Sequence, residues 1–102
     1  MNQLNEKSQP HGLWVEYYKD GKIRSEHNWL NSDRHGVCKD YHENGVLFID
    51  AVYKNGKRVT WSRYFENGSL EVFELYDKMG LCYMKFFNHS GDINQRFHRF
   101  LL

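Results

Sequence analysis

The sequence predicts an all-β protein, a single elongated and twisted antiparallel meander of about eight strands built from hairpin repeats of 23–24 residues. The turn signals Asp20-Gly21, Asn44-Gly45 and Asn67-Gly68 recur at intervals of 24 and 23 residues, and Ser90-Gly91 adds a weaker fourth copy. Aromatic residues make up 17% of the chain and proline occurs once, which favours strands over disorder. Helix-period patterning is absent before the last residues.

Each copy predicts one hairpin, in which a strand of about seven residues, a two-residue turn and a second strand follow one another. The first strand and turn of the four copies span residues 12–21, 36–45, 60–68 and 80–91, and the third is one residue shorter. Further turns at Asn31-Ser32, Asn55-Gly56 and near Met79-Gly80 join successive hairpins. Two columns follow the turn glycines, an apolar one of Ile23, Leu47, Leu70 and Ile93 and an aromatic one of Trp29, Tyr53 and Tyr76.

The two ends of the chain differ from the repeats. Residues 1–10 form a polar N-terminal segment, and residues 11–102 form one repeat domain of about 3.5 copies. In the tail, Phe97, Phe100 and Leu101 stand at helical spacing, so this segment is either a short helix or an edge strand.

The repeat itself points to a family. The pattern Gly-x-Trp-x-x-Tyr-Tyr/Phe-x-Asn-Gly, followed by an apolar residue and by Tyr53-Lys54-Asn55-Gly56-Lys57, resembles the MORN repeat in its shorter bacterial variant form over residues 11–91. Cys38 stands where this repeat has Trp, and Thr60 where it has Gly. The resemblance implies an elongated antiparallel sheet that serves as a scaffold, a lipid-headgroup or protein-binding module, or an antitoxin-like partner.

Strand alternation divides the side chains between two faces. If each Asn-Gly turn is a two-residue loop, Glu16 pairs with Ser25 and Trp14 with His27, which places Trp14, Cys38 and Trp61, with the apolar column, on a predicted core face. A three-residue loop with a bulge, which Asn-Gly also fits, would shift this pairing. The opposite face carries a ladder of Tyr17, Tyr41 and Tyr64 with a repeat of about 9.6 Å, twice the strand spacing. We expect Phe48, Val52, Phe73 and Leu75 to join that ladder as a partner-binding patch.

This patch lacks a covering layer in a single sheet. In strand 46–52 the residues that face either side of the sheet are apolar, apart from Asp50. One hypothesis is that the sheet curls or that a chain end, above all the apolar tail Phe97 to Leu102, folds over the patch. The other is that a partner protein or a sister subunit covers it.

Charge and composition exclude several classes of function. The net charge of +1 lacks the basic excess of a nucleic-acid binder. Residues 1–10 have no secretory signal, and no apolar run approaches the roughly 18 residues that span a bilayer, so we expect a soluble, cytoplasmic protein. Cys38 and Cys82 are expected to lie nearly 20 Å apart, about four strand spacings, and to remain free thiols.

Few residues of the sequence suggest catalysis or metal binding. His27 and Cys38 are predicted to lie across from each other, but His42 is about 13 Å further along a strand and His35 points away, so we expect no metal site. Glu16 and Asp40 occupy equivalent positions and are explained as cross-strand charge partners. No phosphate loop, nucleophile elbow or other catalytic motif is present, and we expect neither an enzyme nor a cofactor.

The sequence therefore predicts a non-catalytic protein-binding or scaffold module, with an antitoxin-like or inhibitory role as one form of it. Aromatic residues are the usual energetic anchors of protein interfaces, which favours the tyrosine ladder and its apolar neighbours. The alternative is a peripheral lipid-headgroup binder that uses basic residues at the turn ends. Membrane contact is the less favoured of the two, because those basic clusters are small.

Overall fold

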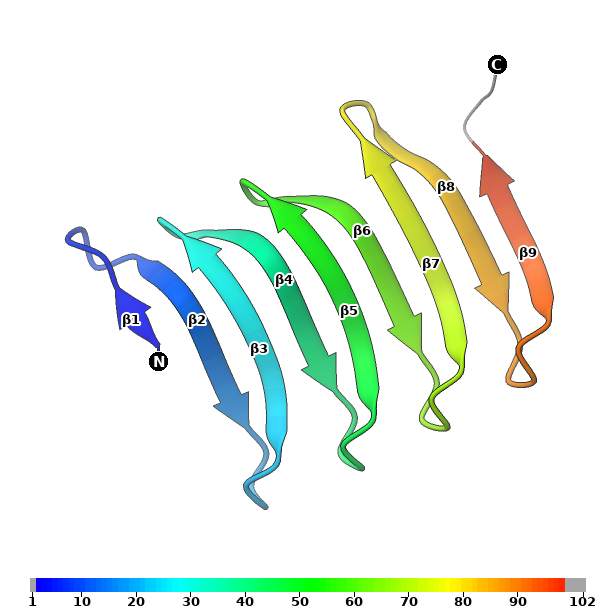
Figure 1. Cartoon of the computed structure of the whole chain (residues 1–102), viewed down its shortest axis with the longest axis horizontal. Coiled ribbons are helices and arrows are strands. Elements are labelled where there is room, and N and C mark those ends of the chain that lie inside the picture. The colour runs from blue at the N-terminus through cyan, green and yellow to red at the C-terminus, as the bar shows by residue number, and fades with distance from the viewer. Residues whose placement is uncertain (1, 99–102) are drawn as a thin grey trace.

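The computed structural model describes residues 2–98, and for residues 94–98 the backbone only. These residues form one antiparallel sheet of nine strands whose spatial order is the order of the sequence (Figure 1). The strands are β1 (Gln3–Leu4), β2 (Pro10–Tyr17), β3 (Ile23–Leu30), β4 (Asp33–Tyr41), β5 (Leu47–Lys54), β6 (Lys57–Tyr64), β7 (Leu70–Asp77), β8 (Gly80–Phe87) and β9 (Ile93–His98). The predicted all-β meander is confirmed.

The sheet is a single curved layer. Its Cα extents are 45 × 37 × 11 Å, and two stacked sheets would be separated by about 10 Å in addition to their own thickness. Among the described side chains the buried apolar ones are small: Cys38, Ala51 and Val72, with Ser25 and Ser62 as buried polar neighbours. Burial is thus achieved inside one layer, where large side chains lean over small ones from adjacent strands.

The Asn-Gly turns are three-residue loops. In the second copy the His42 N–H donates to Val46 O at 2.8 Å, and the Gly45 N–H donates to His42 O at 2.9 Å. Asn44 Oδ1 accepts from the Val46 N–H. Gly45 has φ 90°, as a hairpin of this type requires. The turn position is therefore as predicted, and of the two loop lengths that Asn-Gly fits, the structure has the three-residue loop and not the two-residue loop on which the predicted pairing rests.

The longer loop inserts a bulge after each turn and changes which side chains share a face. Tyr41 pairs with Leu47 and Asp40 pairs with Ile49, so Phe48 is the extra residue between them. Leu47 and its equivalents Ile23 and Leu70 thus face the same way as the tyrosines they pair with. Their predicted place beside Trp14 was wrong, because one additional residue reverses the alternation.

The opposite ends of the hairpins have shorter turns. Asn31-Ser32 and Asn55-Gly56 have positive φ at both residues, which is the type I′ geometry of a two-residue loop. The third connection lies at residues 78–79, between the paired Asp77 and Gly80. All three turns lie within one residue of the predicted positions.

Thr60 stands where the repeat has glycine, and the backbone of the third copy explains the difference. In β4, Gly36 has φ 92° inside a bulge opposite Asn28. The third copy is one residue shorter, and Thr60 pairs directly with Val52 without a positive φ. A glycine is therefore needed only in the longer copy.

The chain ends extend the meander. The polar N-terminal segment contributes β1, and the Asn2 side chain exchanges hydrogen bonds with the backbone N–H and C=O of Val15. At the other end β9 pairs with β8 through His98, so this part of the tail is an edge strand. The hypothesis that the tail folds over the apolar patch depends on residues 99–102, which lie outside the described part of the chain.

Replacing Gly45 by Val should lower the free energy of unfolding by more than about 1 kcal/mol. A Cβ at this position meets no atom within 4 Å, so the loss would come from the backbone φ of 90° alone. Gly45→Asn is the matched control, because asparagine tolerates positive φ far better than a β-branched residue. Urea unfolding measures both variants, and an unchanged midpoint for Gly45→Val would contradict the assigned turn.

Candidate functional site

One face of the sheet carries a continuous groove, which we call the groove face. A row of directly paired residues crosses five strands on it: Trp14, His27, Cys38, Ala51 and Trp61. Paired residues in an antiparallel sheet share a face. The predicted pairs of Trp14 with His27 and of His27 with Cys38 are therefore confirmed, and the second is preserved by the bulge opposite Asn28.

One hollow of this groove lies at Cys38. Cys38 occupies the place that Trp14 and Trp61 hold in the neighbouring copies, and a hollow of about 190 Å³ opens there. Cys38 and Ala51, which are 3% and 1% exposed, form its floor. Arg34, Tyr53, Arg58 and Trp61 line it together with His27, Asp40 and Ile49. A second hollow, lined by Trp14, Trp29 and Arg34 among others, continues the groove over β2 and β3.

Arginines stack on aromatic rings along the groove. The Arg34 guanidinium carbon, on β4, lies 5.3 Å from the ring centroid of Trp29 on β3 and 5.6 Å from that of Tyr53 on β5. Arg58, on β6, contacts a different pair of rings, at 4.7 Å from Trp61 of its own strand and 6.0 Å from Tyr76 on β7. Such cation–π contacts are worth about 0.5–2 kcal/mol and hold the guanidinium in a fixed plane.

The two arginines differ in their polar partners. Arg58 Nη1 donates to Glu74 Oε1 at 3.3 Å and to the Tyr76 hydroxyl at 3.2 Å. Within the described residues, the Arg34 side chain has no hydrogen bond or ion pair, and its Nε is buried without a partner. Arg34 thus presents unused donor groups at the hollow.

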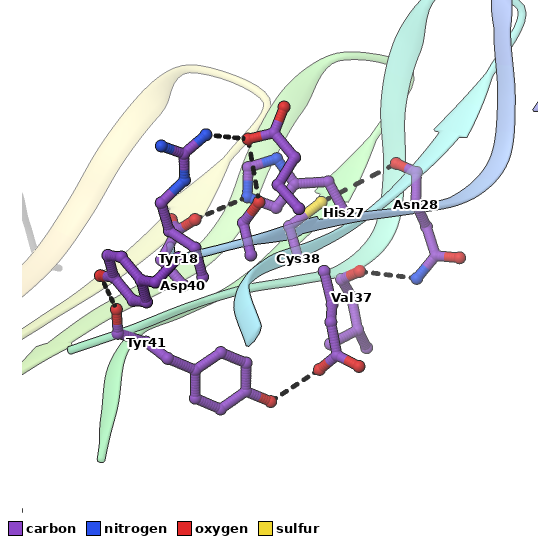
Figure 2. A network of polar contacts seen from close by, with 11 residues as sticks. Tyr18, His27, Asn28, Val37, Cys38, Asp40 and Tyr41 are labelled. Carbon is purple, nitrogen blue, oxygen red and sulfur yellow. Dashed lines mark hydrogen bonds and ion pairs between the residues drawn. The ribbon is translucent and has the colours of Figure 1, made fainter. Parts of the chain in front are cut away.

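His27 and Asp40 form the polar pair of the groove, with His27 Nε2 3.0 Å from Asp40 Oδ1 (Figure 2). The pair becomes an ion pair when His27 is protonated. Burial raises the pKa of the Cys38 thiol, whose Sγ lies 3.8 Å from Asn28 O, so this cysteine is held in its neutral form. Among the described side chains, those of residues 2–93, no group of three or more His, Cys, Asp and Glu could hold a metal ion.

The opposite side of the sheet, which we call the tyrosine face, carries most of the predicted partner-binding residues. Tyr17 is 58% exposed, while Tyr41 donates its hydroxyl to Glu26 Oε1 at 2.7 Å. This hydrogen bond raises the pKa of Tyr41 to about 12. By strand alternation Tyr64 lies on the same face. The exposed apolar residues of the tyrosine face include Val52 and Leu75, and also Leu13 and Val37, which the sequence analysis missed.

Two phenylalanines of the predicted patch behave differently. Phe73 belongs to the tyrosine face, and its ring lies 6.2 Å from that of Tyr83. Phe48 is the bulge residue, and it packs on His42 with ring centroids 4.5 Å apart. It lines a hollow together with His27 and Asp40 of the groove face. The predicted grouping of Phe48 with Val52, Phe73 and Leu75 was therefore wrong.

A ladder of side chains joins the copies at the turns. The Tyr18 hydroxyl donates to Tyr41 O (Figure 2). One copy further along, His42 Nε2 lies 2.9 Å from Tyr64 O. In the third copy Phe65 stacks on His89, with ring centroids 3.9 Å apart. His35 is also engaged, since its Nδ1 accepts from the Asn55 N–H at 3.2 Å.

Sequence analysis missed the stacked arginines of the groove. A signal for them exists, because Arg34 and Arg58 each follow an aromatic residue, Trp29 and Tyr53, by five positions. That spacing marks a repeated arginine column, although only the paired strands show which rings each arginine contacts.

Comparison with protein families assigns the repeat. The profile described as the MORN repeat variant matches residues 10–31 and 34–55, which are the hairpins β2–β3 and β4–β5. These two copies belong to the MORN repeat variant family, so the predicted resemblance is confirmed. Curated proteins and solved structures gave no match. The class defined here is a β-repeat module of the kind that binds proteins or membranes. No helix within residues 2–98 is long and apolar enough to cross a membrane.

Replacing Tyr41 by Phe should destabilise the protein at pH 8 but have little effect near pH 12. The folded state raises the pKa of Tyr41 from about 10 to about 12, so its stabilisation is complete below pH 10 and is lost as the pH rises to about 12. Urea unfolding of the wild type and the variant at several pH values measures this difference. Tyr17→Phe is the exposed control, and a difference independent of pH would contradict the bond to Glu26.

Proposed function

We propose that the protein is a non-catalytic binding module that docks another protein on its groove face. The observation that carries this proposal is the groove itself, with a floor of small side chains and walls of Trp, Tyr and Arg. These three residue types dominate the energetic hot spots of protein interfaces, where a partner's side chain fills a desolvated pocket. A rigid sheet that already holds them in place loses little conformational entropy on binding.

The charges near the turns support a protein partner over a lipid surface. A headgroup binder needs an unpaired basic cluster, worth about 1 kcal/mol per Lys or Arg near an anionic leaflet. Here Lys22 Nζ lies 4.0 Å from Asp20 Oδ2, and Arg24 Nη2 lies 2.6 Å from Glu16 Oε1. Arg58 is paired with Glu74. Three of the six basic residues that suggested membrane contact are therefore neutralised by their neighbours, and the other three, Lys19, Lys54 and Lys57, form only a small cluster at each turn end.

The compartment and the type of partner follow as narrower proposals. Two free thiols, one buried, support a reducing compartment such as the cytoplasm. A small module that occupies a partner's surface without chemistry of its own suits an antitoxin-like or inhibitory role. In that role the groove face would cover a functional surface of the partner.

Partner capture with face-specific variants tests the proposal. Tagged wild-type protein purified from its native cells identifies the partner, and calorimetry on the purified pair gives the affinity. Tyr53→Ala and Trp61→Ala, each made alone, should weaken binding by about tenfold or more if these rings are hot spots. The matched control is Val52→Asp with Leu75→Asp on the tyrosine face, which should leave the affinity unchanged.

Three outcomes would contradict the proposal. Loss of affinity in the tyrosine-face variant alone would move the interface to that side of the sheet. A concentration-dependent dimer in light scattering, abolished by the same variant, would indicate a sister subunit there. Flotation with phosphatidylserine vesicles, without any protein partner, would favour the lipid alternative.

A further inference from the structure

We propose that the hollow at Cys38 is an anchor pocket for a carboxylate of the partner, either an Asp or Glu side chain or a chain terminus, and that Arg34 binds it. This inference rests on the proposed function and names the chemistry of the group that docks.

The position of the hollow gives the first argument. Trp14 and Trp61 occupy the same place in the copies on either side, and Cys38 supplies a far smaller side chain between them. The single layer has no second sheet to fill the space, so a hollow of about 190 Å³ remains. Its floor of Cys38 and Ala51 is apolar, which suits the aliphatic or aromatic part of a residue.

The charge of Arg34 gives the second argument. Among the described residues of the groove face, Arg24, Arg58 and Arg63 each bond a carboxylate, those of Glu16, Glu74 and Glu71. Arg34 has no such partner, although its Nε is buried. A buried donor without an acceptor costs about 1–3 kcal/mol, and a bound carboxylate would remove that cost.

The geometry of Arg34 favours a carboxylate in particular. The rings of Trp29 and Tyr53 hold the guanidinium between them, at 5.3 and 5.6 Å. A guanidinium fixed in one plane can donate two parallel hydrogen bonds to a planar carboxylate.

A doubly charged phosphate fits less well. Asp40 lines the same hollow, and the second arginine of the wall, Arg58, already offsets Glu74. One unpaired guanidinium matches one negative charge, and a second charge beside Asp40 would be repelled.

Titration of ¹⁵N-labelled protein with small probes tests the pocket directly. The probes are N-acetyl-phenylalanine, which has a terminal carboxylate, its neutral C-terminal amide, N-acetyl-aspartic acid amide, which has a side-chain carboxylate, and inorganic phosphate. A carboxylate probe should shift the Nε–H resonance of Arg34 and the amides of Cys38 and Ala51. The neutral amide should bind about tenfold more weakly or worse, as expected for the loss of a charge-assisted hydrogen bond. The two carboxylate probes distinguish a chain terminus from a side chain.

Two variants and one control make the test specific. Arg34→Gln removes the charge, and Cys38→Trp fills the hollow with the residue found at positions 14 and 61. Each should abolish probe binding. Arg24→Gln is the control, since Arg24 lies at the exposed edge of the face in a pair with Glu16. Circular dichroism checks folding, and should Arg34→Gln unfold, Cys38→Trp still decides the question.

The outcomes separate this inference from the proposed function. Binding that survives in both variants, or equal binding of the neutral amide, would overturn the carboxylate pocket. Preference for phosphate would overturn it as well. If no probe binds but Tyr53→Ala and Trp61→Ala still weaken partner binding, the pocket is refuted while the docking face stands.

Discussion

The stacking of arginine side chains on the aromatic rings of the groove face is the contact on which this single-layer sheet most depends. A sheet normally buries one face against another element, and here no second layer is present in the described residues. Arg34 spans Trp29 and Tyr53, and Arg58 spans Trp61 and Tyr76. Arg34 thereby joins a ring of the hairpin β2–β3 to one of the hairpin β4–β5, whereas both rings of Arg58 belong to the hairpin β6–β7. At Arg34 the stability of one copy therefore depends on its neighbour.

The same constraint explains why one substitution in the repeat opens a site. In a two-layer protein the facing sheet could relax into the space that Cys38 leaves in the tryptophan column. In one layer the space stays open on the groove face, with Arg34 and Tyr53 at its wall. Cys38, which departs from the family pattern, is therefore also the residue that creates the candidate site.

The sequence was sufficient for the architecture because the period, the turn residues and the strand alternation all agree. It was insufficient for the faces, since Asn-Gly fits both two-residue and three-residue loops. The three-residue loop adds Phe48 as a bulge residue, and with a side-chain period of two this moved Leu47 to the tyrosine face. Arg34 was missed for another reason: its ring partners Trp29 and Tyr53 lie on β3 and β5, and only the paired strands bring them beside it.

A double-mutant cycle on Arg34 and Tyr53 tests the stacking most directly, because the Arg34 side chain has no hydrogen bond or ion pair within the described residues. Arg34→Met and Tyr53→Leu keep apolar bulk while removing the charge and the ring. The free energies of unfolding of the two single variants and the double variant give the coupling energy. Stacking predicts a favourable coupling of about 0.5–2 kcal/mol. A coupling indistinguishable from zero would show that β4 and β5 are held together by the strand hydrogen bonds and apolar contacts alone.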